Sequence, residues 1–452
     1  MPVELMYIVV LLAVIGVTVI VFKRPIYEAL FISYFVMILI TGQWGKFFTF
    51  MYATTTNALF YAIVAFLALA QLFGKTKAVD AIVAVILFAF GRVRGGAGFV
   101  SLMCSTFMAS LSGSCAGNVA ATGIFTIPAM KKSGFPAHLA ANIESATSTL
   151  GNQVPPAGII FLSFGALDTL YQGQYSISTF WILTWGIGLW FILQRALTIY
   201  AFCRYYNVKP IAKEDIPNLR EVLKKSWPGL FLPLVILLPF LLDNILQEFF
   251  AARIGPGAGE ISRSILLFTP GLAAIYAIVI TRKIADVRPK AIAAIFGEQT
   301  KSIIPVAITI FFAYSISNLF MTLGVGEAVG GMINSLGLNY IALAFVIPLF
   351  TAILGMVLPG SSLAAIFGTT IISIMAAAGG NPLLIAAMIP VITGAMEGMT
   401  PPVALCMYTA MGIAKSGLKE TTLNCLIWVA LHYLLAAVVL LGLLPILGLG
   451  RN

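Results

Sequence analysis

Two loops rich in glycine and serine, each followed about 40 residues later by a Pro-Pro pair, hold the groups most able to bind a ligand. The first loop reads SLSGSCAGN and is followed by GNQVPP; the second reads MVLPGSSLA and is followed by GMTPP. Proline removes a backbone N–H and clashes with the preceding turn, so each Pro-Pro pair frees backbone carbonyls and amides. Freed carbonyls and hydroxyl oxygens can replace the hydration shell of a hard cation such as Na⁺. We therefore predict one Na⁺ site in each half of the chain.

The candidate ligands are the oxygen-bearing and glycine positions of each loop and its break. For the first sodium site they are Ser112, Gly113, Ser114, Asn118, Gly151 and Asn152. For the second they are Gly360, Ser361, Ser362, Gly398 and Thr400. The candidate substrate contacts are Thr122, Gln153, Pro155, Glu397 and Pro401. For any single Ser or Thr, packing between apolar helices is the alternative role, so the prediction concerns the loops as units.

Other chemistry has little support in the sequence. Five cysteines show no CxxC and no metal-ligand spacing, so we expect reduced thiols, no transition-metal site and no cofactor besides Na⁺ as coupling ion. The only histidines, His138 and His432, belong to no hydrolase signature, which argues against an intramembrane enzyme. Glu144 and Glu397 lie inside predicted spans, where a carboxylate serves in proton or cation coupling unless backbone amides cap it.

The composition requires a lipid environment. Of the 452 residues, 60% are hydrophobic and 9% are charged, against roughly 45–50% and 25% in soluble domains. Uncharged stretches of about 20 residues, the length of a spanning helix, recur along the chain. The net charge of +10 comes from short Lys/Arg clusters between these stretches, a pattern typical of membrane topology and not of nucleic-acid binding. The first stretch lacks the features of a signal peptide and is expected to be retained.

Both loops interrupt uncharged stretches and predict re-entrant hairpins. Between Arg94 and Lys131 lie 36 residues without a charge. Two half-length helices meeting at the first loop would return to the side they left and keep the flanking basic residues on one face. The second loop lies between Ser302 and Ala414, where no Lys or Arg occurs. The open ends of the hairpins are therefore predicted on opposite faces of the membrane, so the two halves are inverted.

The two halves also match in sequence, without a gap from 134–156 to 380–402 and with a one-residue slip across the hairpins. Pro136 and Pro382 are 246 residues apart, and the same offset relates the Pro-Pro pairs at 155–156 and 401–402. A lone proline usually marks a structural kink. Paired interrupted segments in two halves instead indicate a transport site, and they fit alternating access better than a fixed pore.

These patterns predict an all-α polytopic membrane protein with about ten spanning helices plus two re-entrant helical hairpins. The first repeat, 1–203, is divided into scaffold helices 1–73, an interfacial arm 78–92, a hairpin 95–131 and a broken helix 136–163. A cytoplasmic linker, 204–226, follows. The second repeat, 227–452, is divided into scaffold helices 228–323, an arm 325–337, a hairpin 341–379, a broken helix 382–412 and a last helix 421–447.

Both motifs resemble a known family. SGSCAGNVAATGIFTIPAMKKSGFPAHLAANIESATSTLGNQVPP is similar to the first signature of the large membrane subunit of tripartite ATP-independent periplasmic (TRAP) transporters, especially the TAXI-associated branch. LGMVLPGSSLA followed by GMTPPVALCMYTAMGIAKSG resembles the second signature. The family often has Ser where this chain has Ala157, and Gly-Leu-Pro-Thr-Thr where it has 357–361, which leaves the side-chain ligands of the second loop open.

The resemblance implies an inverted-repeat, elevator-type secondary transporter of the prokaryotic inner membrane. In such a system Na⁺ drives uptake of a small organic acid, and a periplasmic substrate-binding protein delivers that substrate. TAXI-type large subunits commonly carry a fused small-subunit region, whereas the repeat here starts almost at Met1. We therefore predict a separate small four-helix membrane subunit. A stand-alone elevator carrier, driven by H⁺ or exchange and without a binding protein, is the alternative.

Overall fold

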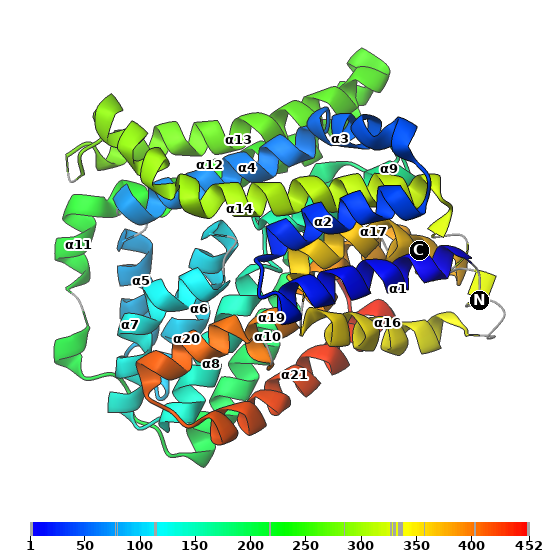
Figure 1. Cartoon of the computed structure of the whole chain (residues 1–452). Helices are drawn as coiled ribbons and strands as arrows, with labels where there is room; N and C mark the ends of the chain where they lie inside the picture. The colour runs from blue at the N-terminus through cyan, green and yellow to red at the C-terminus, as the bar shows by residue number, and fades with distance from the viewer. Residues whose placement is uncertain are drawn as a thin grey trace.

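The computed structural model describes residues 3–449 apart from 77, 79, 113–114, 217, 284, 326–327, 329–330, 333–337, 357 and 402–403. Every regular element within these residues is helical, and none of them forms a strand (Figure 1). The protein is therefore all-α, as the sequence predicts. Buried Leu, Ile, Phe and Ala side chains from nearly all helices form one contiguous core.

Helices follow one another along the chain from α1 to α21. In the first part they are α1 (Val3–Gly16), which continues into a π-helical turn (Val17–Val21), α2 (Ile26–Ile40), α3 (Phe47–Thr55), α4 (Ala58–Thr76), α5 (Asp80–Phe90), α6 (Gly96–Ser112), α7 (Cys115–Ser133), α8 (Ala137–Gly151), α9 (Gly158–Leu170) and α10 (Ile177–Tyr205). In the second part they are α11 (Leu219–Ser226), α12 (Leu232–Ile254), α13 (Ala258–Thr281), α14 (Pro289–Thr322), α16 (Tyr340–Gly355), α17 (Gly360–Ala377), α18 (Pro382–Gly394), α19 (Met396–Met399), α20 (Leu405–Ala414) and α21 (Leu418–Leu440).

Polar caps fix where several of these helices begin, because the first N–H groups of a helix lack intrahelical acceptors. Ser176 Oγ accepts from Thr179 N at 3.1 Å at the start of α10. Asn381 Oδ1 accepts from two backbone amides at the start of α18, where Pro382 occupies the first helical position. Asn57 Oδ1 accepts from Leu59 N at 2.9 Å. This cap lies where the pair of α3 and α4, within the predicted scaffold helices 1–73, bends by 55°.

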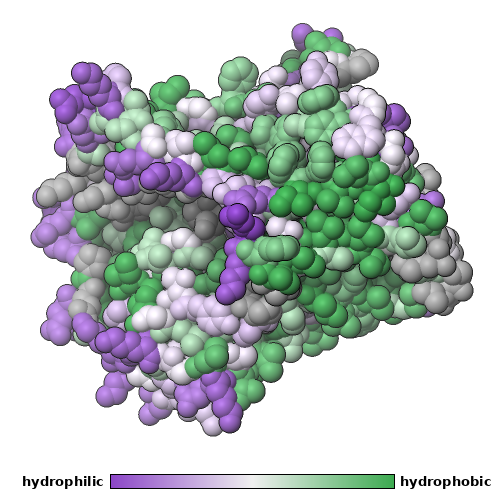
Figure 2. All heavy atoms as spheres, viewed as in Figure 1, coloured by the Kyte–Doolittle hydropathy of each residue, from purple (hydrophilic) through white to green (hydrophobic). Residues whose placement is uncertain are grey.

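Apolar side chains cover much of the outer surface, as expected of a membrane protein. Figure 2 shows hydrophobic residues over the right half of this face and hydrophilic residues gathered at the left edge, where Figure 1 places α11. Among the described residues, five helices are long and apolar enough to cross a bilayer, and one bent pair makes a sixth. Further apolar helices of 10–17 residues include the halves of the broken segments. The count of about ten spans stays a prediction.

Each loop lies at the junction of two packed helices. α6 packs against α7, and both contact α8; α16 packs against α17, and both contact α18. The helix after the first break runs to Leu170, seven residues beyond the predicted end at 163, because no Gly or Pro follows Gly165 before Gly173. The last helix spans Leu418–Leu440 and not 421–447. Most of the predicted arm at 325–337 lies outside the described residues.

The helices α4, α12, α13 and α14 form a second layer, which we call the upper layer. α4, α12 and α13 pack together, and α14 contacts α2, α3, α4 and α17. These long helices run across the upper part of Figure 1, whereas α8, α20 and α21 lie in its lower part. The layers meet where α4 contacts α6 and α9, and where α14 contacts α17. The first break therefore connects α8 in the lower part of Figure 1 to α9 in its upper part, and α19 of the second break lies near the centre.

Candidate functional site

Each loop lies in close contact with the break of its own half, and a glycine stands at each point of contact. A Cβ on Gly151, the last residue of α8, would lie 2.3 Å from the Cβ of Ala109 and 2.7 Å from the backbone N of Ser110. A Cβ on Gly360, the first residue of α17, would lie 2.7 Å from the Cα of Gly394. Side-chain rotation cannot relieve contacts with backbone atoms, so both positions require glycine. Both are among the glycines that the sequence assigned to the two sodium sites.

The two breaks also contact each other. A Cβ on Gly398 would lie 2.5 Å from Cγ2 of Thr149 in α8, and a Cβ on Gly394 would lie 3.8 Å from the Cβ of Asn152. Thr149 Oγ1 lies 3.5 Å from Met399 Sδ. The structure therefore joins the two predicted sites into one centre, which we call the double break: the ends of α8 and α18 with α19 and the adjoining residues of both loops.

Unpartnered polar atoms gather at the double break. Asn118 Oδ1, Asn152 Oδ1, Ser362 Oγ and both amide atoms of Gln153 are buried without a hydrogen-bond partner. The amide nitrogen of Asn118 is engaged, donating to Ser105 O at 3.2 Å and to Ser148 Oγ at 2.8 Å, so its oxygen is left as an acceptor. A buried polar atom without a partner costs about 1–3 kcal/mol. Unpartnered buried oxygens beside each break fit sites that a cation or a polar substrate completes.

The other candidates are placed as follows. Thr400 is buried and donates from Oγ1 to Met396 O at 2.8 Å, whereas Ser361 and Pro401 are half-buried. Pro155 lines a cavity of about 150 Å³ together with Ser110 and Trp185, between the first break and α12. Two loop positions and two side chains lie outside the described atoms: Gly113, Ser114 and the side chains of Ser112 and Glu397.

A buried carboxylate holds the first hairpin against α8. Glu144 is fully buried, and four hydroxyl groups donate to it. Ser101 and Thr126 donate to Oε2 at 2.7 and 2.6 Å, while Ser105 at 2.8 Å and Thr122 donate to Oε1. The predicted substrate contact Thr122 is therefore engaged with Glu144. The sequence singled out Glu144 and, as a substrate contact, Thr122, but not the other three donors, which lie on α6 and α7.

A buried arginine, missed by the sequence reasoning, touches the opposite side of the centre. Arg195 of α10 has no exposed surface. Its Nε donates to Ala146 O of α8 at 3.4 Å, and its terminal nitrogen lies 3.1 Å from Nδ1 of His432 in α21. The ion pairs within the described part of the chain do not include it. An arginine inside an apolar stretch was the signal that could have found it.

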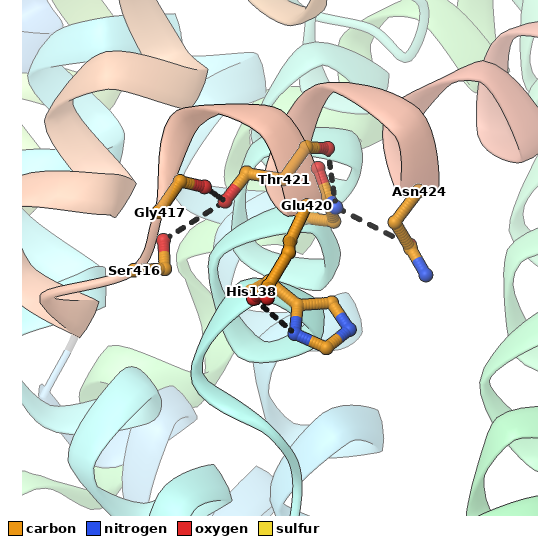
Figure 3. Close-up of polar contacts among 7 residues, drawn as sticks. His138, Ser416, Gly417, Glu420, Thr421 and Asn424 are labelled. Carbon is orange, nitrogen blue, oxygen red and sulfur yellow. Dashed lines mark hydrogen bonds and ion pairs between the residues drawn. The ribbon is translucent and has the colours of Figure 1, made fainter.

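Both histidines contact the other half of the chain, His138 through Glu420 and His432 through Arg195, and His432 also contacts its own half. His432 Nε2 lies 2.9 Å from Val391 O of α18. Figure 3 shows His138 of α8 facing Glu420 of α21, with 3.7 Å between His138 Nδ1 and Glu420 Oε2. Beside this pair, Thr421 Oγ1 donates to Ser416 Oγ at 3.0 Å. The described residues contain no group of three or more His, Cys, Asp and Glu that could hold a metal ion.

The sequence also matches a known family along most of its length. The profile of the family described as "Tripartite ATP-independent periplasmic transporter, DctM component" matches residues 5–447. The chain belongs to this family. The predicted identity as a TRAP large membrane subunit is thereby confirmed, and the protein is a multi-pass membrane protein related to permeases and not to enzymes. The TAXI-like branch stays a prediction.

Two relatives illustrate the TRAP membership, and one solved structure shares the fold. The C4-dicarboxylate TRAP transporter large permease protein DctM of Vibrio cholerae is 26% identical over 389 residues, covering 78% of both chains. The protein of the same name from Pseudomonas aeruginosa is 24% identical over 364 residues, covering 79% of this chain and 78% of its own. The YdaH transporter of Alcanivorax borkumensis superposes with a TM-score of 0.58 at 15% identity, covering 87% of both chains, and so shares the fold.

Proposed function

We propose that this TRAP large permease imports a small organic acid across the prokaryotic inner membrane together with Na⁺, by an elevator movement. The observation that carries the proposal is the set of unpartnered buried oxygens on Asn118, Asn152 and Ser362 at the double break. Hydroxyl, amide and freed carbonyl oxygens suit a hard monovalent cation. Gly151 and Gly360 bring backbone close enough to contribute carbonyls to the same sites.

The order of elements supports an inverted repeat with boundaries 1–203 and 227–452, joined by the linker 204–226. In each half, long helices are followed by a helical hairpin, a broken helix and a last helix. Figure 1 places α6 and α7 on the left and α16 and α17 on the right, on either side of α19, which suits hairpins that open to opposite faces. In the proposed elevator the two hairpins and the two broken helices slide along the layer formed by α4, α12, α13 and α14.

An acidic substrate is supported by positive charge near the double break. α7 begins at Cys115, whose Sγ would lie 3.3 Å from a Cβ on Gly398, and α17 begins at Gly360 beside Gly394. Helix N-termini carry partial positive charge, which attracts a carboxylate. Arg195 adds a buried cation beside Ala146. The relatives named for C4-dicarboxylates suggest the size of such a substrate.

Two partners belong to the proposal. A periplasmic substrate-binding protein would deliver the acid, and a separate small four-helix membrane subunit would complete the membrane complex, as TRAP family membership implies. Coexpression of the chain with its genomic neighbours, followed by co-purification, tests the small subunit. An active transporter recovered from this polypeptide alone would contradict that part of the proposal.

Uptake into proteoliposomes with Na⁺ and H⁺ gradients imposed separately tests the function itself. The purified complex is reconstituted, and the binding protein loaded with a C4-dicarboxylate is added outside. We expect uptake to require the inward Na⁺ gradient and to be insensitive to the H⁺ gradient. Uptake that follows only the H⁺ gradient, or that needs no binding protein, would instead favour the stand-alone carrier.

A further inference from the structure

A basic hollow of about 890 Å³ lies between α5 and α11, formed by residues distinct from those of the double break. Four cationic side chains line it: Arg92 after α5, Lys213 in the linker, and Arg220 and Lys224 on α11. Among the described residues that line it, none is acidic. The nearby Glu221 is exposed and accepts from Asn218 Nδ2 at 3.0 Å. The hollow therefore presents a concentrated positive charge.

Its remaining wall is mostly apolar. Leu219 and Leu223 of α11 and Ile216 of the linker face the hollow together with Phe88 of α5. On α11, Leu219 and Leu223 are four residues apart, so they lie on one face of the helix. The guanidinium of Arg92 lies 4.6 Å from the ring centroid of Phe88, which holds a cationic and an apolar group next to each other. A ligand of this hollow needs both an anionic group and an apolar part.

The location matches the polar–apolar boundary of a bilayer. α5 and α11 contact each other and run side by side at the left edge of Figure 1. Figure 2 shows hydrophilic residues gathered along the same edge. Clusters of Lys and Arg mark the cytoplasmic face, where the anionic lipids of the inner leaflet are found.

We propose that the hollow binds an anionic phospholipid of the cytoplasmic leaflet. Its phosphate accepts hydrogen bonds from Arg92, Lys213, Arg220 and Lys224, and its acyl chains lie along Phe88 and Leu223. Because α5 connects α4 of the upper layer to α6 of the first hairpin, the lipid bridges the linker to the segment that carries this hairpin.

Native mass spectrometry of the purified membrane complex tests this site. The complex is titrated with phosphatidylglycerol and, separately, with phosphatidylcholine of the same acyl chains. The test variant carries Lys213→Gln, Arg220→Gln and Lys224→Gln. The matched control carries Arg282→Gln, Lys283→Gln and Lys290→Gln, which removes the same number of charges from exposed positions just after α13 and in the first turn of α14. The single variant Arg220→Gln serves if the triple variant is not monodisperse.

We expect the wild type and the control to retain phosphatidylglycerol in preference to phosphatidylcholine. The test variant should bind phosphatidylglycerol at least about tenfold more weakly, because each lost charge near a lipid surface weakens its attraction. Equal retention by test and control variants would overturn the proposal. Displacement of the lipid by millimolar inorganic phosphate would overturn it too, since the hollow would then be a site for a soluble anion. The test does not depend on which ion drives transport.

Discussion

Thr149 of α8 lies directly against Gly398 of α19, so that a Cβ on Gly398 would come within 2.5 Å of Thr149 Cγ2. The two residues belong to opposite halves of the chain and flank the two Pro-Pro breaks. Met399, beside Gly398, also contacts Thr149 through its sulfur. Ions bound at the two breaks would therefore be neighbours, and a substrate bound between them would interact electrostatically with both ions.

Gly398→Ala should reduce transport because the added methyl group has no room. Besides Thr149, it would meet Cys406 Sγ at 2.8 Å and Cys115 Sγ at 3.3 Å. Overpacking of this kind costs about 1–3 kcal/mol of folding free energy, so we expect both the unfolding temperature and the maximal uptake rate to fall. The matched control is Gly412→Ala, since a Cβ there has no atom within 4 Å. Equal uptake by both variants would contradict tight contact between the breaks.

Ser362→Ala should separate ion binding from stability. Ser362 Oγ is buried without a partner, so its removal should leave the unfolding temperature in Na⁺-free buffer unchanged or higher. The Na⁺ concentration for half-maximal uptake should rise, because an oxygen of the proposed site is lost. Ser163→Ala is the control: Ser163 Oγ is buried but donates to Ile159 O at 2.9 Å. If Ser362→Ala destabilises the protein and leaves the Na⁺ dependence unaltered, Ser362 is a structural residue.

Glu144→Gln should loosen the first hairpin. A carboxylate accepts all four hydroxyl donors, whereas a Gln side chain offers one oxygen and places an NH₂ group where two donors now point. Hydrogen bonds to charged groups contribute about 1.5–3 kcal/mol each. We expect a fall of several degrees in the unfolding temperature and faster proteolysis between α6 and α7. Glu420→Gln changes an exposed carboxylate and should have little effect on either measurement; equal effects would refute the role given to Glu144.

Arg195→Lys should impair both stability and substrate affinity, although it keeps the positive charge. The guanidinium reaches Ala146 O, His432 Nδ1 and Gln194 Oε1 at once, and a single ammonium group cannot match this planar fork. We expect a lower unfolding temperature and a higher KM for a dicarboxylate in both Arg195→Lys and Arg195→Met. Uptake kinetics at several substrate concentrations check this. A normal KM in Arg195→Met would remove Arg195 from the account of anion preference.

The sequence could predict the loops, the breaks and the family because each leaves a local signal. Gly360 stands between Pro359 and Ser361 in the second loop, Gly151 stands four residues before Pro155 in the first break, and the structure places both glycines in close backbone contacts. It could not predict that Gly398 meets Thr149, because this contact depends on how two segments 249 residues apart pack together.

Arg195 was missed because its partners, Ala146 and His432, carry no signal in the sequence near it. The bend between α3 and α4 was missed because a single Asn cap, Asn57, is a common residue in many settings.

Sodium binding at the double break is the central claim, and Na⁺-dependent unfolding measures it directly. The purified complex is heated at increasing Na⁺, with choline replacing Na⁺ at constant ionic strength, in the wild type and in Asn152→Leu. A ligand that binds the folded state raises the unfolding temperature as its concentration rises. We predict such a rise for the wild type and a much smaller one for Asn152→Leu, whose lost Oδ1 is an unpartnered oxygen of the first site. The same unfolding temperature in Na⁺ and choline, or an undiminished rise in Asn152→Leu, would contradict the claim.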